Sequence, residues 1–136
     1  DTSGRDSLFQ AEARRCKEII DSLEDNKRHF CIFDELFSGT NPNEACASSF
    51  GFIKYLIKSK NIDFILTTHL LDLCKNLDSC IENKYMNVIQ KNDFDFEYTY
   101  KLSKGMSTIK GGLKVLCDLS FPKSILEISN IYLKSI

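Results

Sequence analysis

Two short apolar runs, each stopping abruptly at polar residues, constrain the fold of this chain most. Residues 29–33 are almost wholly apolar and are followed by Asp34 and Glu35. Residues 62–68 form a second such run, which is followed by His69. Short apolar runs bounded in this way are typical of strands that are buried on both faces of a sheet. The pattern therefore predicts two core strands that carry polar side chains at their C-terminal ends.

The segment between the two runs has the signals of a helix. Asn41, Pro42 and Glu44 combine an N-cap candidate, a proline at the first helical position and an acid at the third. Apolar side chains then recur at helical spacing to about Lys58. Strand, helix and strand in this order predict a parallel crossover. Both polar strand ends would then meet at the carboxyl edge of the sheet, where open α/β sheets bind ligands.

The remaining segments predict further elements on either side of the crossover. Ser7 and Gln10 have the spacing of a capping box, so a helix is expected to begin at Ser7. Strict alternation of apolar and polar residues over 94–102 predicts a half-exposed strand, antiparallel to the strand before it. The other expected elements are a short helix, a strand and two closing helices, over residues 70–77, 85–90, 113–119 and 122–133. Together they predict one α/β domain, or most of one.

The charge and composition of the chain mainly exclude classes of protein and kinds of site. With 18 basic and 19 acidic residues the formal net charge is −1, so DNA contacts must be local or made elsewhere. No apolar run approaches the roughly 20 residues of a membrane span, which predicts a soluble, intracellular protein. The six cysteines contain no C-x-x-C pair and are expected to be free, buried thiols rather than zinc ligands. Because the chain opens at Asp1 without a methionine, we expect a piece of a longer protein.

The polar strand ends carry the strongest chemical signal. An apolar strand ending in Asp34 and Glu35 matches nucleotide hydrolases, in which one acid helps to hold Mg²⁺ and the next polarises the attacking water. The alternative is that two acids simply end a strand in solvent. His69 would stand beside them and could bind a γ-phosphate or the attacking water, although it could also only cap the following helix. His29 begins its strand without a partner and is expected to be structural.

Four segments, in this order, resemble the ATPase core of the MutS family of DNA mismatch repair proteins. They are residues 7–12 with the pattern Ser-x-Phe-x-x-Glu, and residues 31–35, 38–42 and 67–69. Downstream, residues 98–102, 105, 112–115 and 121–122 resemble the closing strand and helices of that family. The resemblance implies that residues 1–136 are the C-terminal portion of a P-loop NTPase domain of the ABC type. It would have a mainly parallel sheet flanked by helices, a C-terminal antiparallel strand and closing helices.

The resemblance also implies roles at the strand ends. Asp34 would hold Mg²⁺ through water and help to bind ATP, as the acid of the Walker B motif. Glu35 would be the general base, and His69 would contact the γ-phosphate as the switch histidine. ATP and Mg²⁺ are therefore the expected cofactors.

Further implied roles concern a second subunit. Gly39, Thr40 and Asn41 would form the D-loop, which meets the partner in a homo- or heterodimer and helps to bind the nucleotide. Ser7 would reach across to the ATP of the other subunit, in keeping with the anion affinity of a helix N-terminus. The alternative for Ser7 is an ordinary N-cap.

The chain also departs from the family pattern. Phe37 and Ser38 stand where Gly-Arg is common, and Lys110 and Gly111 stand where Ser-Tyr is usual, which suggests a divergent branch. The phosphate-binding loop, Walker A, would lie upstream, so this segment alone is not expected to bind ATP tightly or hydrolyse it.

The predicted function is an ATPase module of a MutS-like mismatch repair protein, coupling ATP to mismatched or branched DNA bound by upstream domains. One alternative is a MutS-like or other ABC-superfamily DNA-associated ATPase without mismatch recognition. Chromosome-structure and transporter ATPases carry a Leu-Ser-Gly-Gly signature, which residues 5–9 do not resemble. The other alternative is a degenerate dimerisation module, against which the retention of Asp34, Glu35 and His69 argues.

Overall fold

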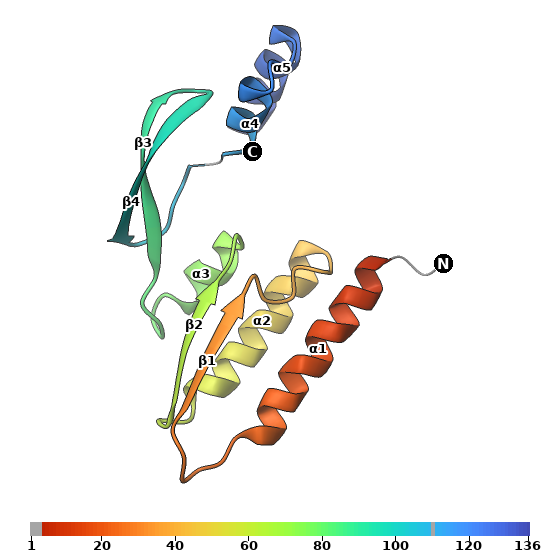
Figure 1. Ribbon diagram of the computed structural model, residues 1–136, viewed down its shortest axis with the longest axis vertical. Helices are drawn as coiled ribbons and strands as arrows, with labels where there is room; N and C mark the ends of the chain where they lie inside the picture. Colours follow the sequence, from red (N-terminus) through yellow and green to blue (C-terminus); the bar gives the residue numbers. More distant parts are fainter. Residues whose placement is uncertain (1–3, 110) are drawn as a thin grey trace. The chain divides into compact units, whose positions relative to one another are not determined.

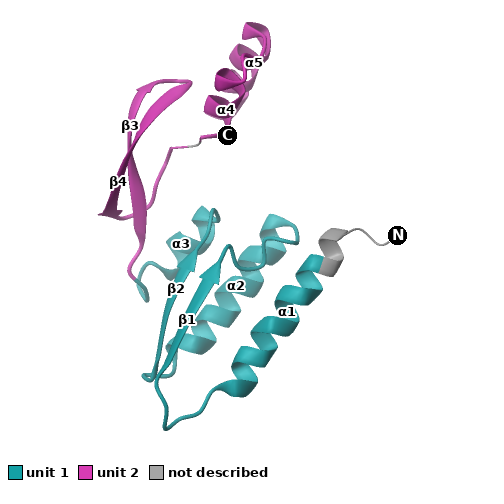
Figure 2. Cartoon of the chain, in the orientation of Figure 1, with its two compact units in different colours: residues 1–81 teal, residues 82–136 magenta. Residues whose placement is uncertain are grey.

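A computed structural model describes residues 4–109 and 111–136, with side chains from Leu8 onward (Figure 1). The chain divides into two compact units, Asp1–Ile81 and Glu82–Ile136 (Figure 2). Both combine helices and strands, so the predicted α/β class is confirmed at this level. Within the described residues, no helix is long and apolar enough to cross a membrane.

The first unit contains the predicted crossover. Its elements are α1 (Gly4–Ser22), β1 (His29–Asp34), α2 (Pro42–Ile57), β2 (Ile62–Thr67) and α3 (Leu71–Leu77). The two strands pair in parallel, in a register that runs from His29 opposite Ile62 to Asp34 opposite Thr67. The predicted parallel pairing is confirmed, and both polar strand ends lie at the same edge.

The helix boundaries agree with the sequence at α2 and differ at α1. Asn41 caps α2 as predicted, since its side-chain oxygen accepts from the backbone N–H of Glu44 at 3.0 Å. Helix α1 begins at Gly4, so the predicted start at Ser7 is wrong by one turn. No proline separates Gly4 from Ser7, and nothing in the sequence stops the helix from continuing toward its N-terminus. The side chain of Ser7 lies outside the described residues.

The core of the first unit lies on one face of the sheet, where α1, α2 and α3 contribute to it. Ile53, Leu56 and Leu77 are completely buried, and the ring of Phe33 packs edge-on against Phe52 with centroids 5.3 Å apart. The opposite face is open, and its side chains are more than half exposed: Phe30, Ile32 and Ile65. The expectation that both strands are buried on both faces is therefore wrong for the described residues, because the helices of this unit cover one face only.

The second unit is a hairpin followed by two helices. Its elements are β3 (Lys84–Asn92), β4 (Asp95–Lys104), α4 (Gly112–Asp118) and α5 (Lys123–Lys134). The strands pair antiparallel, as predicted. They form a two-stranded sheet of their own, whereas we expected a single antiparallel strand added to the parallel sheet. The register is interrupted between Met86 and Val88, and there Tyr100 adopts a left-handed backbone with φ of 57°.

Lysine 114 ties α4 to the hairpin. Its Nζ lies 3.4 Å from Asp95 Oδ1 and 2.8 Å from Asp118 Oδ2, and it stands 5.8 Å from the centre of the Phe96 ring. The hydrogen bond to Asp118, and then the contact with Asp95, raise the pKa of Lys114. These contacts lie wholly inside the second unit and orient its first helix on the hairpin.

Candidate active site

The ends of β1 and β2 are joined by side chains as well as by backbone. Asp34 and Thr67 are register partners, and the Thr67 hydroxyl donates to Asp34 Oδ1 at 2.6 Å. The backbone N–H of Glu35 donates to both Thr67 O at 2.9 Å and Thr67 Oγ1 at 3.0 Å. The pairing of the two strands therefore continues one residue past the end of β1.

Glu35 turns the chain at this point. Its φ of 52° is left-handed, which is uncommon for a residue other than glycine. Successive side chains on a straight strand point to opposite faces, so this turn is what redirects the Glu35 carboxylate. Its Oε1 lies 2.7 Å from His69 Nε2, with the side chains 49% and 88% exposed respectively. The structure thus brings Glu35 and His69 into contact, next to the hydrogen bond between Asp34 and Thr67.

The loop after Glu35 is anchored in the core. Leu36 and Phe37 are 7% and 6% exposed, although neither belongs to a helix or strand. Phe37 packs against Phe9 of α1 and Phe52 of α2, with ring centroids 5.6 and 6.3 Å apart. The buried Ser49 hydroxyl donates to Leu36 O at 3.4 Å. These contacts fix the start of the loop and so support the turn at Glu35.

The residues expected to face a second subunit lie at the start of α2. Gly39 is buried, and the side chains of Thr40 and Asn41 donate to Glu44 Oε2 at 3.0 and 2.6 Å. The three residues therefore form an ordered helix start. Their contact with a partner subunit or nucleotide stays a prediction, as does the role of Ser7.

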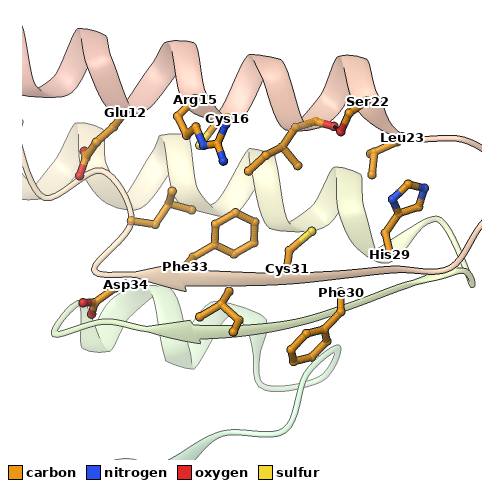
Figure 3. A pocket seen from close by; sticks show the side chains of 13 residues that line it. Glu12, Arg15, Cys16, Ser22, Leu23, His29, Phe30, Cys31, Phe33 and Asp34 are labelled. Carbon is orange, nitrogen blue, oxygen red and sulfur yellow. Dashed lines mark hydrogen bonds between the residues drawn. The ribbon is translucent and has the colours of Figure 1, made fainter.

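A groove runs between α1 and β1 (Figure 3), and Asp34 lies at one end of it. Glu12 lies toward the same end, and its Oε2 is buried without a hydrogen-bond partner among the described residues. Burial, with a contribution from the Glu12 carboxylate, raises the pKa of the Cys16 thiol to about 11. At the other end the His29 ring contacts the backbone N–H and carbonyl of Glu24 at 3.0 and 3.2 Å. His29 thus has a partner in the Glu24 backbone, and this contact supports the structural role expected for it.

The donor set at the strand ends fits a magnesium ion held mostly by a nucleotide. Mg²⁺ in such sites takes one or two carboxylates and completes its shell with water and phosphate oxygens. Asp34 offers a carboxylate, of which Thr67 occupies one oxygen. Among the described residues, no group of three or more His, Cys, Asp or Glu is arranged to hold a metal. Asp34 therefore has a second carboxylate oxygen that could contact such an ion, directly or through water.

Thr67 is the residue at this site to which the sequence patterns assigned no role. It belongs to the segment 67–69, in which the resemblance implies a role for His69 alone. The signal that could have identified it is register: the two apolar runs end together, which places a hydroxyl directly opposite Asp34.

The cysteines differ from the expectation in one respect. All six are free, as predicted, but only Cys16 is buried; Cys80 is exposed, and the other four are partly exposed: Cys31, Cys46, Cys74 and Cys117. The Ser79 hydroxyl, and then Lys54 Nζ at 3.5 Å, lower the pKa of the Cys80 thiol.

We expect iodoacetamide at pH 7.5 to alkylate Cys80 well before Cys16. A thiolate is the reactive form, and a lowered pKa increases its fraction near neutral pH whereas the raised pKa of Cys16 decreases it. Mass spectrometry of peptides from a time course measures the order. A Lys54→Met variant should slow the labelling of Cys80, and labelling of Cys16 first would contradict the assignment.

The sequence of this chain is similar to that of known proteins. A family model described as MutS domain V matches residues 1–136. MutS protein homolog 4 of Mus musculus is 32% identical over 134 residues, which is 92% of this chain and 14% of that protein. DNA mismatch repair protein MSH3 of Saccharomyces cerevisiae is 31% identical, covering 90% of this chain and 12% of its own length. Endonuclease MutS2 of Fusobacterium nucleatum is 29% identical, with 93% and 16% covered.

The chain therefore corresponds to a small part of each of these relatives. The family match extends over every element of both units, including the strand ends that carry Asp34, Glu35 and His69. The chain belongs to the MutS family, in which it corresponds to domain V.

Proposed function

We propose that this chain is part of an ATP-hydrolysing module of a MutS-family protein, coupled to domains outside the chain that bind mismatched or branched DNA. The observation that carries the proposal is the contact of 2.7 Å between Glu35 and His69, beside the bonded pair of Asp34 and Thr67. Hydrolysis of a nucleotide requires a carboxylate that helps to hold the metal, a general base and a group that contacts the phosphate, and these would be Asp34, Glu35 and His69 at one edge of the sheet.

The residues divide the work as follows. Mg²⁺, when bound, neutralises charge on the phosphates of the nucleotide. Asp34 would help to hold that ion, and Glu35 would take the proton of the attacking water as general base. His69 orients the Glu35 carboxylate and, with its side chain 88% exposed, is free to turn toward the γ-phosphate. The buried anchors at Leu36 and Phe37 keep this arrangement in place.

The proposal includes a site shared by two subunits of a homo- or heterodimer. The start of α2 is held by hydrogen bonds of Thr40 and Asn41 to Glu44, and Gly39, Thr40 and Asn41 would meet the partner there. Ser7 would contact the nucleotide of the other subunit. The 136 residues contain no G-x-x-x-x-G-K-[ST] motif, so the phosphate-binding loop comes from a part of the protein outside this chain. The chain alone would then be inactive.

A related candidate is a MutS-type ATPase that acts on DNA without recognising mismatches. The names of the matched relatives support this second candidate, because one is called a mismatch repair protein and another an endonuclease. Affinity for a mismatched duplex over a fully paired one, measured in the longer protein, separates the two.

We expect Asp34→Asn in the longer protein to raise the Mg²⁺ concentration for half-maximal ATP turnover by on the order of tenfold. Asparagine still accepts the Thr67 hydrogen bond but lacks the charge that attracts the ion. Steady-state ATP hydrolysis across a Mg²⁺ titration measures the shift, with Asp63→Asn as control, because Asp63 pairs with Arg28 on the surface. Absence of ATP hydrolysis by the unmodified protein would reject the proposed function.

A further inference from the structure

The Thr67 side chain connects the two acidic residues of the site. It lies on β2, whereas Asp34 and Glu35 lie at the end of β1, and it contacts both. We propose that Thr67 is a positioning residue for the hydrolysis proposed above, acting through Asp34. The inference rests on that proposed function, and the experiments below separate the two.

The hydrogen-bonding capacity of the hydroxyl matches its surroundings. A threonine hydroxyl has one hydrogen to donate and two lone pairs to accept. Its hydrogen goes to Asp34 Oδ1 at 2.6 Å, and one lone pair accepts the Glu35 N–H at 3.0 Å. A hydroxyl bonded to a carboxylate at this distance forms a charge-assisted bond, which is stronger than a neutral one. The bond directs one carboxylate oxygen of Asp34 toward β2 and leaves the other for a ligand.

At Thr67 a substitution can remove the side-chain hydrogen bonds while leaving the backbone hydrogen bond in place. The Glu35 N–H also donates to the Thr67 carbonyl oxygen, at 2.9 Å, and this bond does not depend on the side chain. Replacement by valine would therefore keep the strand pairing and the turn at Glu35. What it removes is the fixed orientation of the Asp34 carboxylate.

The neighbouring Thr68 makes a different hydrogen bond. The Thr68 hydroxyl accepts from the backbone N–H of Leu70 at 3.0 Å, just before α3. It contacts neither acid in the described structure. Threonine is also restricted in χ1 because it is branched at Cβ, and this restriction limits the positions that the Thr67 hydroxyl can take. The role is thus specific to Thr67 and calls for a hydroxyl there.

We expect Thr67→Val in the longer protein to lower kcat for ATP about tenfold while KM for ATP changes little. Thr67→Ser, which restores the hydroxyl, should recover most of the rate. A general structural defect would not be rescued selectively by serine. Unchanged kcat in Thr67→Val, or an equal loss in Thr67→Ser, would overturn the inference.

Glu35→Gln, measured alongside, keeps the two proposals distinguishable. If Glu35→Gln abolishes turnover while Thr67→Val does not lower it, the proposed function stands and the role of Thr67 is wrong. If Glu35→Gln leaves turnover intact, Glu35 is not the general base, and if the unmodified protein does not hydrolyse ATP, the proposed function itself fails.

A second readout does not depend on activity. In urea unfolding of this chain, Asp34→Ala and Thr67→Val should be non-additive, because both remove the hydrogen bond between Thr67 and Asp34. The double variant should lose less stability than the sum of the two single variants, although Thr67→Val also removes the acceptor of the Glu35 N–H. Strict additivity would show that the bond contributes nothing and would overturn the inference. Thr67→Ala, which cannot overpack the strand end, replaces the valine variant in both experiments if the latter does not fold.

Discussion

Glu35→Gln in the longer protein is expected to lower the ATP turnover rate by about three orders of magnitude while leaving ATP binding intact. General-base catalysis contributes 10² to 10⁴ in rate, and a neutral amide cannot take a proton from water. Glutamine has nearly the same shape and can still accept from His69 Nε2, which lies 2.7 Å from Glu35 Oε1. The site should therefore assemble and stall. Single-turnover hydrolysis and equilibrium binding of a fluorescent ATP analogue measure the two quantities separately.

The control for this change is Glu127→Gln. Glu127 lies on α5 in the second unit, and among the described residues its one ion pair is a surface contact of 4.0 Å with Lys123. The same loss of charge there should leave turnover unchanged. Hydrolysis that survives in Glu35→Gln would remove Glu35 from the role of base. Loss of ATP binding together with hydrolysis would instead indicate that the charge supports the structure of the site.

The elements nearest the site could be predicted because their signals are local. The apolar run of β1, the cap of α2 at Asn41 and the apolar run of β2 each specify their own element. A helix between two such strands leaves little choice but parallel pairing. From that pairing it follows that Asp34 and His69 share an edge of the sheet. The proximity of His69 to the two acids could therefore be predicted from the sequence, whereas the direct contact between Glu35 and His69 also depends on the turn at Glu35.

Other features depend on information that no short stretch of sequence carries. An apolar run gives the same pattern whether one or both of its faces are covered, so the open face at Phe30 and Ile32 could not be foreseen. A hairpin pattern likewise does not say which sheet the hairpin joins, and within the described residues β3 and β4 pair only with each other. The left-handed turn at Glu35 arises from tertiary contacts, among them the burial of Phe37 between α1 and α2.

The core beneath the site gives the other large expected effect. Ile53→Ala should lower the free energy of unfolding of this chain by about 3 kcal/mol, because Ile53 is completely buried and its truncation leaves a cavity. Alanine favours the helix slightly, by a few tenths of a kcal/mol, so packing loss dominates over propensity. Ile131→Ala on α5, where the side chain is 71% exposed, is the matched control and should shift the urea midpoint little. Because Phe52 beside Ile53 packs on both Phe33 and Phe37, the loss should also loosen the turn that holds Glu35. Equal effects of the two changes would contradict the assignment of the core to α2.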